Sequence, residues 1–470
     1  MVGIIDIGES MKTDTIAAIA TAMTNAGIGI VRISGDEAFT IIDRIYQSKT
    51  GEKKLSEEKS HTIHYGYICD GDKVIDEVMI LLMRAPNSYT REDTVEIDCH
   101  GGTLVMRRIL ETVIKYGARP AEPGEFTKRA FLNGRIDLSQ AESVMDLIQA
   151  KNDFALESSL NQLKGIVLQK IKSLRGKIIH EIAFIEAALD DPEHISIEGY
   201  DIQLLDKLKE LIEEIKKLIQ SSEDGQLLKE GIRTIIVGKP NAGKSSLLNA
   251  LLGKERAIVT DIAGTTRDAL EEQISLHGFT LNIVDTAGIR DTNDIVEKIG
   301  VDKTKDYLLN SDLIIYVVDA SIPLDENDEK IMGLISDKKS IVLLNKSDLE
   351  VVISDDQIKD RMGVNTLLLS FSAKEGIGLE KLSDMIRELF FRGEISFNDE
   401  VIITNVRQKA ALSNALNSLQ MVENSINSGM PEDFYSIDLM NAYEELGSII
   451  GESVGEDLVN EIFSKFCMGK

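Results

Sequence analysis

This 470-residue sequence is poor in cysteine, has no long apolar run and carries no excess of basic residues. The three cysteines, Cys69, Cys99 and Cys467, form no C-x-x-C pair, which argues against a zinc site and favours reduced thiols in the cytoplasm. No stretch reaches 18 consecutive apolar residues, so no membrane span is expected. The amino terminus has no basic leader, so no signal peptide is expected either. The net charge of −27 excludes a protein whose main function is to coat nucleic acid electrostatically. It does not exclude contact with RNA through a small basic patch or through a partner protein.

The length predicts two to four domains, and the first, residues 1–128, has a mixed pattern. Its short apolar runs predict strands at 28–33, 78–83 and 94–97. Helical spacing predicts helices at 38–45 and 104–110. The first region is therefore an α+β domain.

Helical periodicity dominates residues 129–230 and returns in residues 392–470. One apolar stripe steps by three and four from Leu160 to Leu189, which predicts a single unbroken helix that Asp191-Pro192 ends. Further helices are expected over 204–218, from 406 to about 426, and over 439–466. Because neither piece can bury its apolar stripe alone, we expect them to form one discontinuous helical bundle.

Residues 231–391 alternate nearly continuous apolar strands with helices. The strands are expected at 234–237, 281–284, 313–318, 340–344 and 367–370. Such strands are typical of a mostly parallel sheet that helices cover on both faces. The sequence thus predicts a multidomain α/β and α chain, in which an α/β domain is inserted into the helical domain.

A phosphate-binding loop follows the first strand of that inserted domain. Residues 238–245 read G-x-x-x-x-G-K-S between a strand and a helix, which is the context that the motif requires. The loop's N–H groups and the helix N-terminus favour phosphate. Lys244 supplies positive charge to the outer phosphates, and the Ser245 hydroxyl is a Mg²⁺ ligand.

Four further segments follow in the order that a GTPase needs: residues 264–268, 285–288, 345–348 (Asn-Lys-Ser-Asp) and 372–374 (Ser-Ala-Lys). With the phosphate-binding loop, they predict that the inserted domain is a Ras-like P-loop domain. Asp285 is expected to hold the Mg²⁺ shell through water, and Thr266 to be the second hydroxyl ligand of Mg²⁺. Asp348 can accept two hydrogen bonds from a guanine edge, whereas adenine presents the wrong donor pattern, so GTP is preferred to ATP. The expected nucleotide contacts are Asn241, Ala242, Gly243, Lys244, Ser245, Ser246, Thr260, Asp261, Ile262, Ala263, Gly264, Thr265, Thr266, Asp285, Thr286, Ala287, Gly288, Asn345, Lys346, Ser347, Asp348, Ser372, Ala373 and Lys374.

The position that holds a water-orienting glutamine in Ras-type sites is occupied by Ile289, which cannot form that hydrogen bond. Asn241 and Glu297 are the available replacements. From its immediate sequence alone, Glu297 is better explained as a solvated helix carboxylate.

Four segments together resemble the MnmE (TrmE) family of tRNA-modifying GTPases: residues 241–245, 260–268, 123–133 and 467–470. The resemblance implies an N-terminal domain that dimerises and binds 5-formyltetrahydrofolate. It also implies a heterotetramer-type complex with the FAD-containing partner MnmG (GidA). That complex adds an aminomethyl or carboxymethylaminomethyl group to C5 of the wobble uridine of certain tRNAs. In the family, K⁺ promotes the meeting of two G domains across GTP.

Residue roles follow from this resemblance. It places Asn241, Thr260, Ile262 and Thr265 around K⁺, with Asn241 and Lys244 in catalysis, and it makes Glu297 the water-orienting residue. It places Arg32, Glu96, Arg135 and Lys470 at the folate and gives Cys467 a part in the modification. The loop at 22–27 departs from the family's Pro-Pro-Gly turn, and residues 1–12 precede its usual start, so Met11 is an alternative initiator.

Two other functions fit parts of the sequence. One is a ribosome-assembly GTPase that binds rRNA; the other is a folate-dependent transferase with a regulatory G domain. The 230 residues before the G domain and the Cys-Met-Gly-Lys end argue against the first. The net charge suggests that the partner supplies much of the grip on tRNA.

Overall fold

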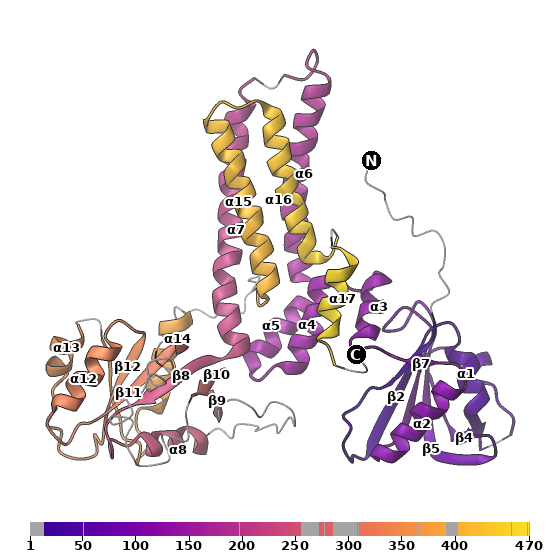
Figure 1. Ribbon diagram of the computed structural model, residues 1–470, viewed down its shortest axis with the longest axis horizontal. Coiled ribbons are helices and arrows are strands. Elements are labelled where there is room, and N and C mark those ends of the chain that lie inside the picture. Colours follow the sequence, from indigo (N-terminus) through magenta and orange to yellow (C-terminus); the bar gives the residue numbers. More distant parts are fainter. Residues whose placement is uncertain are drawn as a thin grey trace. The chain divides into compact units, whose positions relative to one another are not determined.

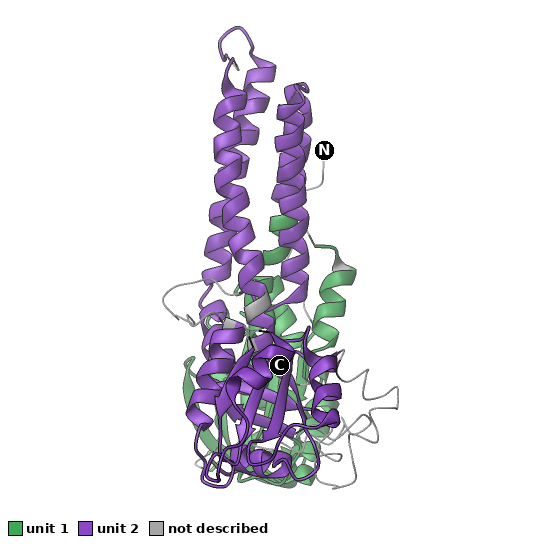
Figure 2. Ribbon diagram, turned by 90° about the vertical axis from the view of Figure 1, so that its left-hand side faces the viewer, with its two compact units in different colours: residues 1–145, 444–470 green, residues 146–443 purple. Residues whose placement is uncertain are grey.

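The structure is a computed structural model that describes residues 14–49, 51–196, 198–254, 272–276, 278–284, 308, 310–363, 366–391, 403–452, 454–467 and 469. The chain forms two compact units, residues 1–145 with 444–470, and residues 146–443 (Figure 2). Across the described ranges, every helix is too short or too polar to cross a membrane.

The first unit is built on a seven-stranded sheet in the order β3-β4-β5-β6-β2-β1-β7 (Figure 1). All its pairs are antiparallel except β1 with β7. The strands are β1 (Ile16–Ile19), β2 (Ile28–Ser34), β3 (Tyr46–Ser48), β4 (Thr62–Asp70), β5 (Lys73–Met83), β6 (Thr94–His100) and β7 (Arg119–Pro120). The three predicted strands correspond to β2, β5 and β6.

Helices α1 (Ala38–Ile45) and α2 (Thr103–Lys115) pack against one face of this sheet. Both were predicted, α1 with its observed ends. The short 3-10 helix η1 (Leu55–Glu57) packs beside α1. Helices α3 (Glu125–Leu132) and α17 (Glu456–Ser464) share a smaller core with the start of α4 (Leu138–Gln149), around Leu138 and Phe463. Residues from the carboxyl end of the chain thereby complete this unit.

In the second unit, α6 (Ile166–Asp190), α7 (Tyr200–Glu230), α15 (Val406–Asn427) and the first part of α16 (Glu432–Ile450) form the helical bundle, preceded by α5 (Asp153–Leu163). A buried hydrogen bond and a cation–π contact join the helices as well as apolar contacts. Glu181 of α6 accepts a bond of 2.6 Å from the Tyr200 hydroxyl, and the Arg175 guanidinium lies 3.9 Å from the Tyr443 ring of α16. Helices from both predicted helical stretches pack together in this unit, α7 against α15.

Two predicted helices are interrupted. The prediction of one unbroken helix over 160–189 is wrong, because α5 ends at Leu163 and α6 begins after Gly165. The φ of Gly165 is +89°, a backbone conformation that favours glycine. The helix expected over 439–466 is also two helices, α16 and α17, separated at Gly451, whose φ is +88°. In both cases the apolar spacing continues across a break that the glycine makes, so periodicity alone could not locate it.

The second unit also contains a six-stranded sheet in the order β13-β12-β11-β8-β10-β9. Its strands are β8 (Ile232–Val237), β9 (Glu272–Leu276), β10 (Phe279–Ile283), β11 (Leu313–Asp319), β12 (Ser340–Asn345) and β13 (Leu367–Ser370). All pairs are parallel except β9 with β10. The predicted parallel sheet is confirmed; the edge strand β9 was not predicted.

Helices cover both faces of this sheet, as expected. Helices α8 (Lys244–Lys254) and α14 (Leu379–Phe391) pack on one face. Helices α12 (Glu326–Ile335) and α13 (Asp355–Met362) pack on the other. Helices cover the two faces of the central strands, so ligands cannot bind there. In folds of this kind they bind at the carboxyl ends of the parallel strands.

Candidate functional site

The phosphate-binding loop connects β8 to α8 at the carboxyl edge of the parallel sheet. Gly238 and Gly243 have φ values of +152° and +105°, and Asn241 has a φ of +60°. A Cβ at Gly238 would lie 2.3 Å from the Val317 carbonyl oxygen of β11. The loop therefore needs glycine at its first position, and it holds Asn241 in a backbone conformation that costs energy, which is common at functional sites.

Lys244 begins α8, and its ammonium donates hydrogen bonds to the carbonyl oxygens of Gly238 (2.7 Å) and Lys239 (2.8 Å). The ammonium thus lies inside the curve of the loop, where phosphate oxygens bind in this motif. Ser245 and Ser246 follow in the first helical turn and are exposed, so the hydroxyl of Ser245 can serve as a metal ligand.

Asn345 joins three predicted segments that are far apart in the sequence. It ends β12 and is 2% exposed. Its Nδ2 donates to the Ala242 carbonyl at 2.7 Å, and its Oδ1 accepts from the Ala373 amide at 3.0 Å. The phosphate loop, the Asn-Lys-Ser-Asp segment and the Ser-Ala-Lys segment are therefore brought together, as the sequence predicts.

The next residues present the predicted base-recognition group. Asp348 is exposed and accepts a hydrogen bond of 2.6 Å from the Ser372 hydroxyl. That bond lowers the pKa of the Asp348 carboxyl, so it stays ionised as an acceptor for guanine donors. Lys346, with a φ of +63°, binds Asp319 at the end of β11, a carboxylate that the sequence analysis did not identify.

Several predicted residues of this site lie outside the described part of the chain. They are Thr260, Asp261, Ile262, Ala263, Gly264, Thr265, Thr266, Asp285, Thr286, Ala287, Gly288 and Glu297, and Lys470 is outside it as well. In the ranges that are described, no three His, Cys, Asp or Glu side chains form a group that could hold a metal ion.

The predicted folate residues of the first unit lie close together. Arg32 and Glu96 are directly opposite on β2 and β6, and the Arg32 Nε lies 2.7 Å from the Glu96 Oε1. The Arg32 Nη1 also donates to the Gly469 carbonyl at 3.3 Å. The carboxyl end of the chain is thereby held beside this pair, and the exposed Cys467 lies in the same segment.

Tyr89 connects the two predicted arginines. Its ring centroid is 4.7 Å from the Arg135 guanidinium and 5.8 Å from that of Arg32. The Tyr89 hydroxyl is 3.0 Å from the Thr127 hydroxyl of α3. No sequence signal marks Tyr89, because nothing local distinguishes it from other loop tyrosines.

A glycine-rich loop between a parallel strand and a helix, tied to an Asn-Lys-x-Asp segment, defines a P-loop GTPase domain. Family models agree: one described as the GTP-binding protein TrmE N-terminus matches residues 15–135, and one described as the MnmE helical domain matches residues 138–467. The chain belongs to the MnmE (TrmE) family and is a GTP hydrolase.

Individual relatives match along almost the whole chain. The tRNA modification GTPase MnmE of Lachnoclostridium phytofermentans is 61% identical over 98% of this chain and 100% of its own. Its namesake from Thermoanaerobacter pseudethanolicus is 50% identical, with the same coverage. Among solved structures, the G domain of the T. maritima FeoB iron transporter covers 34% of this chain and 98% of its own, at 28% identity and a TM-score of 0.25.

Proposed function

We propose that the protein is a K⁺-stimulated GTPase that works with the FAD-containing MnmG to modify C5 of the wobble uridine in certain tRNAs. The added group is aminomethyl or carboxymethylaminomethyl. The observation that carries this proposal is the 61% identity, over the full length, to a protein named tRNA modification GTPase MnmE. We propose three domains: an N-terminal domain of residues 1–128, a helical domain of residues 129–230 with 392–470, and the inserted G domain of residues 231–391.

The geometry of the phosphate loop supports the nucleotide part of the proposal. Lys244 would contact the outer phosphates, and Asp348 would accept the two donors of the guanine edge. Mg²⁺ would neutralise developing phosphate charge. Ser245 fits it as an exposed hydroxyl ligand, with Thr266 as the proposed second.

The arginine pair of the first unit supports the folate part. 5-Formyltetrahydrofolate carries a polar pteridine edge and a carboxylate tail, and it would supply the one-carbon unit. Glu96 offers an acceptor for ring N–H groups, whereas Arg32 and Arg135 offer cations, so the charges fit this ligand. Gly469, two residues after Cys467, accepts a hydrogen bond from Arg32, which places the end of the chain beside this cation.

The open face of the seven-stranded sheet supports a homodimer. Ile63, Tyr65 and Met79 are 64%, 53% and 42% exposed, and they lie on the face opposite to α1 and α2. Tyr65 and Met79 are direct cross-strand partners on β4 and β5. Uncovered apolar side chains gathered on one sheet face mark an interaction surface.

Nucleoside analysis of bulk tRNA tests the whole proposal. A deletion strain should lose the modified wobble uridine, and the wild-type gene should restore it. Normal wobble uridines with altered ribosome profiles would instead favour the rRNA-binding alternative.

The K⁺ requirement predicts a salt-specific rate. GTP turnover at saturating GTP should be at least about tenfold faster in K⁺ than in Na⁺, because one fixed cation stabilises the transition-state charge. The variant Asn241→Ala should lose this difference and retain the Na⁺ rate. Steady-state phosphate release in matched chloride salts measures both; equal wild-type rates in the two salts contradict a role for the ion.

Glu297→Ala should separate binding from hydrolysis. A residue that only orients water adds nothing to ground-state affinity, so the Kd for GTP should stay within about twofold while kcat falls by about 100-fold or more. Asp294→Ala, three residues earlier, is the matched control and should behave as wild type. A fully active Glu297→Ala would return this residue to an ordinary solvated carboxylate.

A further inference from the structure

Lys239, the second residue of the phosphate-binding loop, has a buried side chain that binds a neighbouring helix. The residue is 8% exposed. Its ammonium lies 2.6 Å from the Asp328 Oδ2 and 2.9 Å from the Asp325 Oδ2. Asp325 caps the N-terminus of α12, and Asp328 is in its first turn. The loop is therefore fixed to α12 by a cation between two carboxylates.

The carboxylate that faces Lys239 has several further partners. The Tyr316 hydroxyl of β11 donates to the Asp328 Oδ1 at 2.8 Å, and the Asp325 amide donates to the Asp328 Oδ2 at 3.0 Å. Burial tends to lower the pKa of Lys239, but its bonds to Asp328 and Asp325 raise it overall. Burial also raises the pKa of Tyr316, which keeps its hydroxyl protonated as a donor. A satisfied buried network of this kind fixes one geometry.

The backbone of the same residue reaches the nucleotide side of the loop. The Lys239 carbonyl accepts a hydrogen bond of 2.8 Å from the ammonium of Lys244, the phosphate-binding lysine. The side chain of Lys239 thus holds α12 while its carbonyl holds Lys244. Any shift of the Lys239 backbone would move the Lys244 ammonium with it.

We infer that Lys239 is a positioning residue for GTP binding and hydrolysis, which acts through its ion pair with Asp328. The pair sets the first turn of the loop before nucleotide arrives, so that less ordering is needed on binding. This inference rests on the proposed GTPase function of the loop. It assigns Lys239 no contact with the phosphates.

The decisive variant removes both charges. Lys239→Met alone would leave Asp328 buried without its cation and could unfold the domain, so it is combined with Asp328→Asn. In the full chain we expect the Kd for GDP to rise about tenfold, or about 1.4 kcal/mol, with a lower kcat at saturating GTP and a melting temperature within a few degrees of wild type. The single variant Lys239→Arg, which keeps both the cation and Asp328, should retain the wild-type Kd and kcat.

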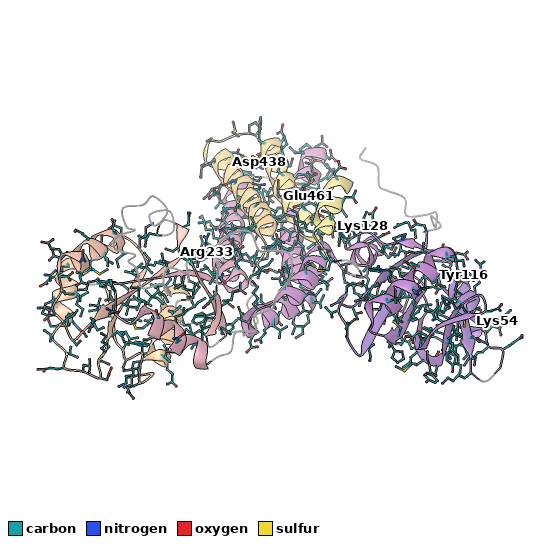
Figure 3. The ribbon with its side chains drawn as sticks, turned by 60° about the horizontal axis from the view of Figure 1, so that its bottom comes forward. Lys54, Tyr116, Lys128, Arg233, Asp438 and Glu461 are labelled. Carbon is teal, nitrogen blue, oxygen red and sulfur yellow. The ribbon has the colours of Figure 1, made fainter. Side chains whose placement is uncertain are left out.

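Arg233→Gln with Asp312→Asn is the matched control. This ion pair, 3.3 Å between the Arg233 Nε and the Asp312 Oδ2, lies at the start of β8, the opposite end from the loop (Figure 3 labels Arg233). The control should bind GDP as wild type does. Fluorescence titration with a labelled GDP, steady-state hydrolysis and thermal melting give the three readouts.

Three results would overturn the inference. The first is wild-type Kd and kcat in the double variant with an unchanged melting temperature, and the second is wild-type Kd and kcat with a lowered melting temperature. The third is a weakened GDP affinity in the single variant Lys239→Arg. If the wild-type protein itself neither binds GDP nor hydrolyses GTP, the proposed function fails instead, so the two failures are distinguishable.

Discussion

Gly243→Ala should reduce guanine-nucleotide affinity by about 30- to 1,000-fold. Gly243 has a φ of +105°, and a Cβ there would lie 2.0 Å from the Asn345 Nδ2. The left-handed backbone costs of order 1–3 kcal/mol for alanine. Relief of the overlap would break the Asn345 bond to Ala242, which costs about 1 kcal/mol or more when the donor is buried. Together these costs of about 2–4 kcal/mol correspond to about one and a half to three decades in Kd at about 1.4 kcal/mol per decade.

Gly253→Ala is the control for this variant. Gly253 lies on α8, ten residues from Gly243, and a Cβ there would meet no atom within 4 Å. The Gly253→Ala protein should bind nucleotide as wild type does, and the substitution should stabilise the helix by up to about 1 kcal/mol. Calorimetric titration with GDP measures both variants. A Gly243→Ala protein that binds within threefold of wild type would show that Asn345 does not join the loops in solution.

The nucleotide site was largely predictable because its chemistry is local in the sequence. Each loop follows a strand, and the carboxyl ends of parallel strands meet at one edge. Asn345 and Asp348 were predicted as nucleotide contacts, and the structure places Asn345 against the phosphate loop, with its Nδ2 2.7 Å from the Ala242 carbonyl oxygen. The ion pairs of Lys239 were not predictable, because its partners Asp325 and Asp328 are about 90 residues away and no spacing rule links them.

Helix breaks were the weakest predictions for a physical reason. Apolar spacing indicates which face of a segment should be buried, and the stripe that starts at Leu160 runs on into α6 without a visible break. In the structure Leu160 is 39% exposed, and α5 buries a different face, made by Ala155, Ser158, Ser159 and Gln162. The break depends on the backbone of Gly165 and on packing that the pattern does not encode. In contrast, α1 matched its predicted ends because a strand follows it at once.

Arg129→Met should destabilise the first unit by about 3–5 kcal/mol, because it removes one partner of a buried charge cluster. The Arg129 guanidinium lies 2.9 Å from the Glu125 Oε1 and 3.1 Å from the Glu92 Oε1. All three residues are less than 10% exposed. It also contacts Asp14 at 2.8 Å. The variant would leave Glu92 without this cation, so the first thermal transition of the full chain should fall by roughly 10 °C.

Lys128→Met tests whether the loss is electrostatic or general. Lys128 is the preceding residue of α3, and its ammonium donates an exposed hydrogen bond of 2.6 Å to the Asn460 Oδ1 (Figure 3 labels Lys128). This control should lose about 1 kcal/mol or less. A similar fall in both variants would mean that substitution in α3, rather than an uncompensated charge, causes the instability.

The pH dependence of the Arg129→Met deficit provides the sharper test. Burial tends to raise the pKa of Glu125, but hydrogen bonds from Arg119, the Glu122 amide and Arg129 lower it overall from its ordinary value of 4.5. In the wild type this contribution to stability is present above about 4.5 and is lost as pH falls through the lower folded pKa. Without Arg129, one of the groups that lower the pKa of Glu125 is gone, so this buried carboxylate takes up a proton more readily. The deficit should therefore be smaller at pH 5 than at pH 8, and an equal deficit at both would exclude charge burial as its cause.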